Sequence, residues 1–341
     1  MAGFSGGPDS LALAASLQRV AEKTPLRLVA VHVDHALRDS SGAEMERAAD
    51  LARVLDIPFR AHRLPRDPRQ AHPGVGLEEA ARRERYRAFA QIGDESGAAA
   101  VATGHHQGDQ AETILLHLGR GSGLKGLAGM ADDQVLSLPW WKEDGPMRQL
   151  RVWRPFLPET RTTLQRYLDG RGLVAIQDPS NNDVSLRRNQ VRRHVVPALE
   201  AAFPRWTTSL ERLARIVSDD DEALEQWSDQ AARQITTSAG EISMSDLTCY
   251  PIAVQRRIVR RWLSASGIRP LPSFNRVDAI LRSAQQGTGR RLIEIGERRF
   301  VQTRGGRLRI GQDGELAGQL GHPAGPDRDA LVDGINEVDA R

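Results

Sequence analysis

The sequence predicts an α/β protein whose doubly wound, mainly parallel sheet is Rossmann-like, followed by a smaller, mostly helical domain with a short β element. Two observations predict this fold. Apolar runs of strand length alternate with amphipathic helical patterns in the first half of the chain, and helical patterns dominate the second half. The 341 residues also suffice for two domains, each with a core of its own.

The alternation in the first half can be assigned to particular segments. Leu26–Val33 and Ala98–Thr103 are apolar runs of strand length. Helical patterns cover Asp9–Ala21, Ala43–Leu55, Leu77–Ile92 and Gln107–Leu118. Because strands that alternate with helices are joined by right-handed crossovers, the strands should be parallel. Ligands of such sheets bind beyond the carboxyl ends of the strands, so the segments after each strand are the first candidates for a site.

Glycine, proline and charge patterns divide the rest of the chain. Residues 65–76 and 119–129 are rich in glycine or proline and are predicted to be loops that cover a site. Beyond residue 183, helices are expected up to 235, including an amphipathic one over Pro204–Ile235, then two more over 250–285 and a small antiparallel sheet over 290–310. We therefore expect a first, α/β domain over 1–205, a helical domain over 206–312 and a disordered tail over 313–341.

Composition narrows the class of protein. Hydrophobic residues make up 40% and charged residues 27%, as in ordinary soluble proteins. No apolar run reaches the roughly 18 residues of a membrane-spanning helix, and we see no signal peptide. Cys249 is the only cysteine, which excludes an internal disulfide, a CxxC redox pair and a cysteine-based zinc site. The expected location is the cytoplasm.

The basic residues are almost all arginine, since lysine occurs only at Lys23, Lys125 and Lys142. Arginine clusters occur at 187–193, 256–261 and 290–299. Any one cluster could be a solvated face, but three in one half of the chain favour a partner rich in phosphate.

The strongest motif is Ser5-Gly6-Gly7-Pro8-Asp9-Ser10, which follows a short apolar stub expected to be the end of a first strand. Gly6 and Gly7 let the backbone turn and bring its N–H groups close to an anion. Pro8 suits the first position of a helix, whose N-terminus attracts phosphate. A Walker lysine is absent, so the loop suits pyrophosphate held while the α-phosphorus is attacked. The alternative is a glycine turn that merely caps a helix.

Two further strand ends carry polar side chains. His32 and Asp34 share one face of the second strand and His35 lies at its tip; Asp34 could bind magnesium or take up a proton, or only cap the next loop. After the third strand, Asp109 and Glu112 share a helix face. Glu112 could complete a capping box, the two carboxylates could bind an ammonium group or magnesium, and His105, His106 and Asp109 could bind a metal, although not in a tetrahedral zinc pattern.

Several motifs in order resemble the tRNA(Ile)-lysidine synthase family of PP-loop ATP pyrophosphatases. They are SGGPDS, VHVDHALR, EEAARRERYRAF, ATGHHQGDQAETILLHLGRGSGLKGLAGM and RPFL…DPSNNDVSLRRNQVRRHVVPAL. The resemblance covers residues 1 to about 200, and the region ending in FVQTRGGRLRI looks like the smaller substrate-binding domain of that family. A further C-terminal domain of some members is expected to be absent.

The resemblance implies a ligase of tRNA modification with two substrates besides ATP. ATP adenylates the C2 oxygen of the wobble cytidine in an isoleucine tRNA with a CAU anticodon and pyrophosphate leaves. The ε-amine of free L-lysine then displaces AMP and gives lysidine. Magnesium would accompany ATP, and no membrane is expected to take part. The resemblance does not decide whether the protein forms a homodimer.

The resemblance also assigns roles to residues of this sequence. ATP would be bound by Ser5, Gly6, Gly7, Pro8, Asp9, Ser10, His32 and Gly104, and magnesium by Asp9 and Asp34. The catalytic residues would be Asp34, Asp109 and Glu112, and lysine would be bound by His105, Asp109 and Glu112. The tRNA would be contacted by Arg188, Asn189, Arg192 and Arg193.

Two positions depart from the family pattern. Gly108 stands where the family has the first of two adjacent aspartates, and Leu186 where an aromatic residue is usual. Thiolating PP-loop enzymes need more cysteine than Cys249, and amidating ones need an ammonia source of which the sequence shows no sign. The remaining alternatives are a catalytically weakened tRNA-binding paralogue and another adenylating PP-loop enzyme.

Overall fold

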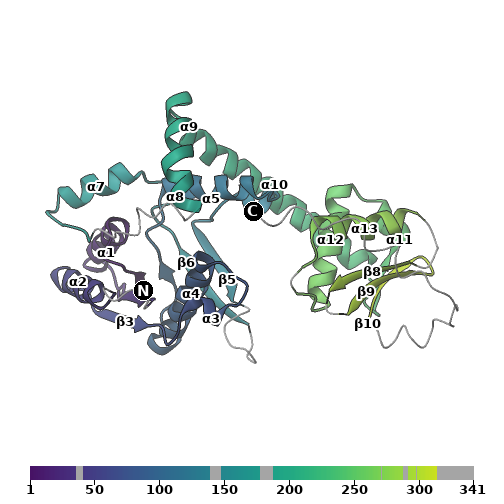
Figure 1. Ribbon diagram of the computed structural model, residues 1–341, viewed down its shortest axis with the longest axis horizontal. Coiled ribbons are helices and arrows are strands. Elements are labelled where there is room, and N and C mark those ends of the chain that lie inside the picture. The colour runs from purple at the N-terminus through teal and green to yellow at the C-terminus, as the bar shows by residue number, and fades with distance from the viewer. Residues whose placement is uncertain are drawn as a thin grey trace. The chain divides into compact units, whose positions relative to one another are not determined.

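The computed structural model describes residues 1–35, 41–138, 147–176, 187–269, 271–286, 291–296 and 298–312. The chain divides into two compact units, Met1–Asp220 and Asp221–Arg341 (Figure 1). The division falls within helix α10 (Trp206–Ile235), so the domain boundary expected after residue 205 stays a prediction. The tail over 313–341 lies outside the described residues.

A six-stranded sheet forms the centre of the first unit. Its strands follow the order β3-β2-β1-β4-β6-β5. Their bounds are β1 Ala2–Gly3, β2 Ala30–Asp34, β3 Phe59–Arg63, β4 Val101–Ala102, β5 Asp133–Leu138 and β6 Arg148–Trp153. All neighbours pair in parallel except β5, which is antiparallel to β6 at one edge. The mainly parallel sheet is therefore confirmed.

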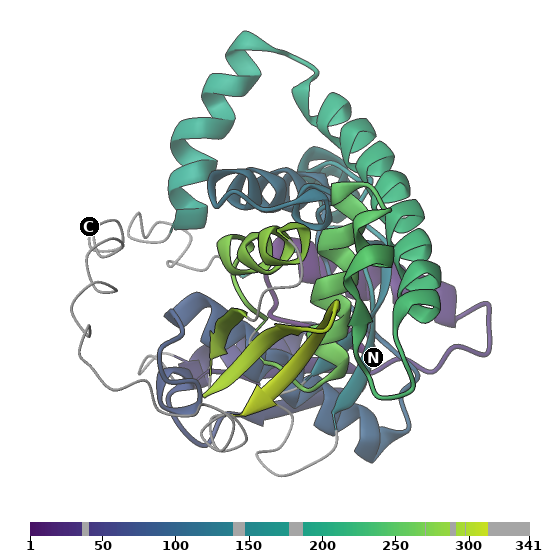
Figure 2. The same cartoon turned by 90° about the vertical axis from the view of Figure 1, so that its right-hand side faces the viewer.

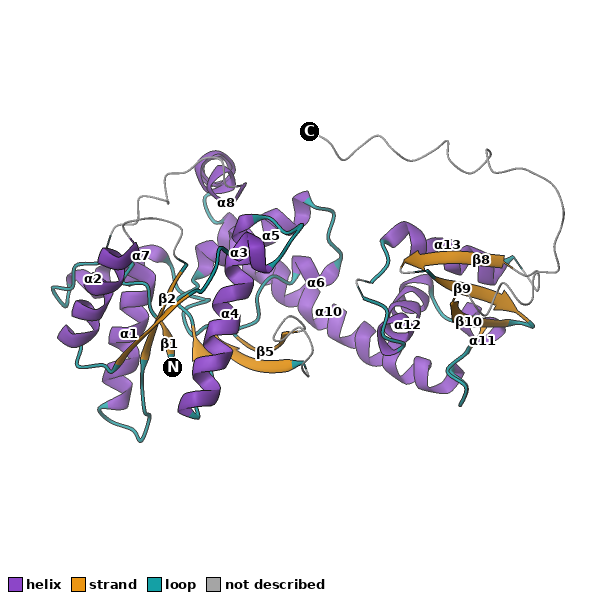
Figure 3. Cartoon of the chain, turned by 60° about the horizontal axis from the view of Figure 1, so that its bottom comes forward, coloured by secondary structure: helices purple, strands orange, loops and turns teal. Residues whose placement is uncertain are grey.

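Helices cover both faces of this sheet, which confirms the doubly wound architecture (Figures 1 and 3). On one face α1 (Pro8–Ala21), α2 (Ser41–Val54) and α7 (Arg161–Asp169) bury Leu11, Ala48 and Leu164 in one core cluster. On the other face α4 (Leu77–Ser96) buries Tyr86 and Phe89 against strand residues. Each helix buries the apolar stripe that its sequence shows.

Some elements differ from the sequence prediction. Strand β2 begins at Ala30 rather than at residue 26, because its partner β1 is two residues long and pairs Ala2 with Ala30. The expected loops 65–76 and 119–129 contain the short helices α3 (Pro68–Ala71) and α6 (Leu124–Leu127). Strand β3 escaped prediction because its sequence, FRAHR, is mostly polar and half exposed.

The helices that follow the sheet bring a second segment to the strand ends. Helix α5 (Gln107–Gly119) follows β4. Beyond the sheet lie α8 (Arg187–Gln190), a π-helix η2 (Val191–Val195) and α9 (Val196–Ala202). Helix α8 and η2 pack against α5 although about 80 residues separate them in the chain. This packing creates most of the geometry described below.

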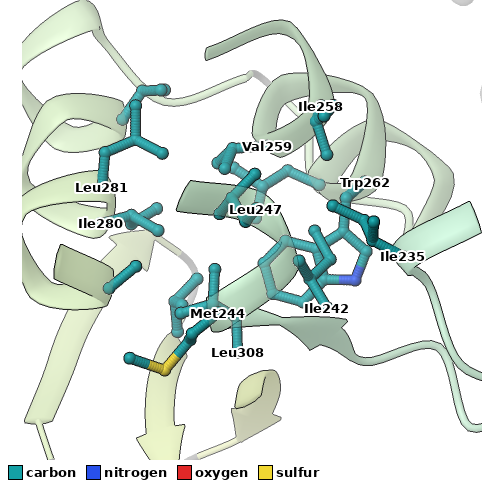
Figure 4. Close-up of a cluster of buried hydrophobic side chains, with 14 of the residues drawn as sticks. Ile235, Ile242, Met244, Leu247, Ile258, Val259, Trp262, Ile280, Leu281 and Leu308 are labelled. Carbon is teal, nitrogen blue, oxygen red and sulfur yellow. The ribbon is translucent and has the colours of Figure 1, made fainter. Parts of the chain in front are cut away.

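The second unit has its own helices, sheet and core. Its elements are β7 (Ile242–Ser243), α11 (Met244–Thr248), α12 (Ile252–Ala265), α13 (Phe274–Gln285), β8 (Arg291–Gly296), β9 (Arg299–Arg304) and β10 (Arg307–Gln312). The strands form an antiparallel sheet, β7-β10-β9-β8, beside α13 (Figure 2). Leu247, Ile258 and Ile280 are fully buried in its core (Figure 4). The expected helical domain with a short β element is confirmed.

Within the described ranges, none of the helices combines the length and the apolar character that crossing a bilayer requires.

Candidate active site at the strand ends

The phosphate loop connects β1 to α1 and is held by its own hydroxyl groups. Gly6 has φ +78°, and Gly7 caps the helix that Pro8 begins. The Ser5 backbone N–H donates to Ser10 Oγ at 3.2 Å, and Ser10 Oγ donates to the Gly7 carbonyl at 3.0 Å. The loop therefore keeps its turn without help from distant side chains, at a helix N-terminus that attracts anions.

Two neighbouring segments pack directly against this loop. The Ile176 N–H donates to the Gly6 carbonyl at 2.9 Å, and a Cβ at Gly6 would lie 2.5 Å from Ile176 Cδ1. A Cβ at Gly104 would lie 2.7 Å from the Asp9 carbonyl oxygen, so only glycine allows the end of β4 to touch the first turn of α1. Strands β1 and β4 are neighbours in the sheet although they are not consecutive, so the predicted ATP residues meet at its topological switch point.

The end of β2 is enclosed rather than open. His32 Nδ1 lies 3.0 Å from the Phe4 carbonyl, and burial lowers the pKa of His32, which keeps its ring neutral. Asp34 is 2% exposed, accepts a hydrogen bond from Ser41 Oγ at 3.3 Å and lies 3.6 Å from Arg63 Nε. These contacts fix the Asp34 carboxylate in place.

Asp9 is the carboxylate that best fits a magnesium ion carried by phosphate. Its Oδ1 is buried and accepts no hydrogen bond from the described residues. Burial raises the pKa of Asp9, against the effect of His106, whose Nε2 lies 3.8 Å away. Magnesium binds one or two carboxylates together with substrate phosphates. Among the residues that the structure describes, no group of three or more His, Cys, Asp or Glu could hold a metal alone.

Helix α5 begins with a capping box formed by His106 and Asp109. His106 Nδ1 accepts from the Gly108 N–H at 2.9 Å, and Asp109 Oδ2 accepts from the His106 N–H at 3.0 Å. The reciprocal capping partner is thus Asp109 and not Glu112, which lies one turn further on and faces other groups. A Cβ at Gly108 would lie 2.8 Å from His106 Cε1, so glycine allows the imidazole to fold over the helix start.

Asp109 and Glu112 do share a face, and two arginines occupy it; we call these four residues the acidic corner. Arg188 Nε donates to Glu112 Oε2 at 2.8 Å and its Nη2 donates to Asp109 Oδ1 at 3.0 Å. Arg192 Nε donates to Glu112 Oε1 at 2.6 Å and its Nη2 donates to Glu112 Oε2 at 3.0 Å. Two of the residues predicted to bind lysine therefore contact two of those predicted to bind tRNA.

Electrostatics keep Asp109 and Arg188 ionised. Although burial opposes it, His106 and Arg188 lower the pKa of Asp109. Although burial lowers it, Asp109 and Glu112 raise the pKa of Arg188. Burial lowers the pKa of His105 to about 3, and its Nδ1 lies 2.8 Å from Thr103 Oγ1. At neutral pH the corner holds charged ion pairs beside a neutral imidazole.

The helical spacing of the RN-x-x-R segment explains which of its residues reach the corner. Arg188 and Arg192 are four residues apart and therefore lie on one face. Asn189 is buried, and Arg193 is exposed. Leu186, which stands where the family usually has an aromatic residue, lies outside the described residues.

Two residues that sequence reasoning missed hold the loop between α6 and β5. Gln110 accepts from the Met130 N–H at 2.8 Å and donates to the Met130 carbonyl at 3.0 Å. Arg154 is 1% exposed, and its Nη1 donates to the Ala131 carbonyl at 2.7 Å. Both residues lie in motifs that the family resemblance had singled out, Gln110 in GDQAE and Arg154 in RPFL. The spacing of residues in the sequence does not indicate either contact.

The arginine cluster at 256–261 is largely engaged inside the second unit. Arg256 pairs with Asp278, and Arg257 with Asp221. Arg261 pairs with Glu225 at 2.9 Å. These carboxylates lie on α10 and α13, so three of the arginines tie helices together. The phosphate-rich partner expected for the three clusters together stays a prediction.

The fold and the loop define the class of protein. A doubly wound sheet whose first strand enters a glycine turn without a Walker lysine is that of PP-loop proteins, and the PP-loop domain family matches residues 1–199. The TilS substrate binding domain matches residues 243–309, within the second unit.

Similarity to whole proteins is more specific. The tRNA(Ile)-lysidine synthase of Thermobifida fusca is 37% identical over 77% of this chain and 76% of the relative. Those of Streptomyces coelicolor and Salinispora tropica are 34% and 36% identical over 90% and 89% of this chain, and 84% and 88% of the relatives. The chain belongs to the tRNA(Ile)-lysidine synthase family, which confirms the resemblance seen in its motifs.

A solved structure supports the fold alone. The U34-tRNA thiolase NcsA from Methanococcus maripaludis matches with a TM-score of 0.51 at 16% identity, over 64% of this chain and 70% of that one.

Proposed function

We propose that this protein ligates L-lysine to C2 of the wobble cytidine of an isoleucine tRNA with a CAU anticodon and converts ATP to AMP and pyrophosphate. Membership of the family supports ATP and tRNA as substrates. The observation that carries the lysine assignment is the pair Asp109 and Glu112, which lies at the end of β4 beside the phosphate loop. A catalytically weakened paralogue is not favoured, because the family relatives are named as synthases.

The first step needs the phosphate loop. Gly6 and Gly7 precede the first turn of α1, beside the Ser5 and Ser10 hydroxyls, and pyrophosphate would be held there. The C2 oxygen of the cytidine attacks the α-phosphorus, and the bond to the bridging oxygen breaks. His32 and Gly104 would border the adenosine. Magnesium, held by Asp9 and Asp34 as the family resemblance implies, would neutralise phosphate charge.

The second step needs the acidic corner. Asp109 and Glu112 would bind the lysine ammonium group, and His105 would border it as a neutral ring. The ε-amine reacts only without its proton, which Glu112 would accept. Asp109 suits charge balance better than proton transfer, because a carboxylate with a lowered pKa is a weak base at neutral pH. The amine then attacks C2, and AMP leaves. We also propose the cytoplasm as the location, because the substrate is tRNA.

The test separates the two steps. The protein is incubated with ATP, magnesium, labelled lysine and a CAU-anticodon tRNA transcript, and both pyrophosphate release and lysine in tRNA are measured. Glu112→Gln should lower lysine incorporation about 10- to 100-fold, since a hydrogen bond to a charged group contributes roughly 1.5–3 kcal/mol. Pyrophosphate release should change much less.

The matched control is Glu46→Gln on the exposed surface of α2, which should change neither readout. Binding of tRNA by the unaltered protein without pyrophosphate release would support the paralogue and overturn the proposal.

A further inference from the structure

The acidic corner is filled by the chain's own cations. Both oxygens of Glu112 accept charged hydrogen bonds, from Arg192 on Oε1 and from Arg188 and Arg192 on Oε2. Asp109 accepts from Arg188 through Oδ1 and from the His106 N–H through Oδ2. Glu112 is 4% exposed, so no open face of this carboxylate remains for another cation.

A lysine ammonium cannot bind beside these guanidinium groups. It would need the same carboxylate oxygens, all of which already accept hydrogen bonds, and two guanidinium groups would repel a third cation where solvent does not screen them. Lysine and the two arginines therefore compete for one site.

We propose that Arg188 and Arg192 are an internal occupant of the lysine site and that tRNA releases them. The proposal rests on the lysine role given above to Asp109 and Glu112. Phosphate oxygens of tRNA compete well for arginine, because a guanidinium binds phosphate and carboxylate with the same bidentate geometry. Lysine then binds more tightly after tRNA, when the cytidine that it must attack is already present.

The π-helix η2 supplies a local means of moving Arg192. A π turn closes its hydrogen bond over five residues instead of four. Return of Val191–Val195 to α-helical geometry would rotate the residues after Gln190 relative to α5 and carry Arg192 away from Glu112. Arg188 lies in α8, before this turn, so its side chain would have to rotate away from the carboxylates while its backbone stays in place.

Population arithmetic gives the size of the effect. The apparent affinity for lysine falls by the fraction of molecules whose corner is open. If the arginines leave the corner in about one molecule in ten, lysine binds about tenfold more weakly to the free protein than to the tRNA complex.

The experiment is equilibrium dialysis of radiolabelled L-lysine against the full chain, with and without the CAU-anticodon tRNA transcript and without ATP. We expect tRNA to tighten lysine binding about tenfold or more. The variant Arg188→Ala/Arg192→Ala should bind lysine tightly without tRNA and gain nothing from it. Arg192→Ala, which leaves Arg188 to compensate Glu112, should lie between the two and guards against misfolding of the double variant.

The matched control is Arg187→Ala. Arg187 is the neighbour of Arg188 in the chain but lines a cavity with Leu115, Val191 and His194. This variant should keep the dependence on tRNA. Equal lysine affinity of the unaltered protein with and without tRNA would overturn the inference and leave the proposed function intact. Failure to bind lysine under both conditions would instead overturn the lysine role of the corner itself.

Discussion

The phosphate loop and the acidic corner lie at neighbouring strand ends and are built in opposite ways. The loop is held mainly by contacts within Ser5–Ser10, to which the Ile176 N–H adds one hydrogen bond to the Gly6 carbonyl. The corner is held by ion pairs between α5 and a segment about 80 residues later. The loop is therefore preformed for an anion, whereas the corner is formed around cations that belong to the chain. The difference suggests that ATP meets a ready site and lysine a site that must first be vacated.

Gly6→Ala should break the preformed loop and have the largest effect. Alanine at φ +78° costs about 1–2 kcal/mol, and its Cβ would lie 2.5 Å from Ile176 Cδ1. Since a displacement of about 1 Å at a reacting centre costs roughly 10²-fold, ATP-dependent pyrophosphate release should fall by about that factor.

Gly97→Ala at the end of α4 is the control for backbone strain, because φ is +64° there and a Cβ would meet nothing within 4 Å. It should lower thermal stability with little loss of activity. Equal activity losses in the two variants would show that the loop's shape is not needed.

Gly108→Asp tests the acidic corner, and its effect on activity should be smaller than that of Gly6→Ala. It restores the family's paired aspartates, but its Cβ lies 2.8 Å from His106 Cε1 and displaces the imidazole that caps α5. Loss of a helix cap lowers the free energy of unfolding by about 1 kcal/mol, and a new negative charge at a helix start raises it by roughly 0.3–1 kcal/mol. We expect nearly unchanged stability and a several-fold lower rate of lysine incorporation.

Gly108→Ala makes the same steric change without the carboxylate and should lower the rate similarly. A rate that rises only in the aspartate variant would show that Gly108 had weakened the enzyme.

The sequence predicted what depends on nearby residues. The glycine turn, the helix that Pro8 starts and the shared face of Asp109 and Glu112 all follow from spacing within a few positions. The parallel sheet follows from the alternation of strands and helices. These predictions needed no knowledge of long-range packing.

The sequence could not predict which charge meets which. Arg188 and Arg192 look like phosphate ligands in a list of arginines, and only the packing of α8 and η2 on α5 shows that carboxylates hold them. Sequence reasoning offered Glu112 as the reciprocal partner in the capping box, whereas the fold turns Asp109 toward the His106 N–H. Ion pairs depend on three-dimensional approach, which hydrophobic periodicity does not encode.

Two arginines of the second unit test whether ion pairing separates structural arginines from phosphate ligands, and the expected effects are the smallest. Arg256 pairs with Asp278 at 2.9 Å and lies 4.7 Å above the Phe274 ring, so it ties α12 to α13. Arg260 is exposed and forms no ion pair with the described part of the chain. Arg256→Ala should destabilise the contact by about 1 kcal/mol, which corresponds to roughly fivefold faster hydrogen exchange in α12 and α13.

Arg260→Ala should leave that exchange unchanged and lower the salt dependence of tRNA binding by about one counterion. The two residues have the same chemistry and lie four positions apart, so their composition and spacing cannot distinguish them. If both variants changed tRNA affinity equally and neither changed exchange, the ion pair of Arg256 would yield to phosphate as we infer for Arg188. Arginines bound to carboxylates would then form a reserve of phosphate ligands in both units, and release by tRNA would be a general property of this chain rather than of its active site.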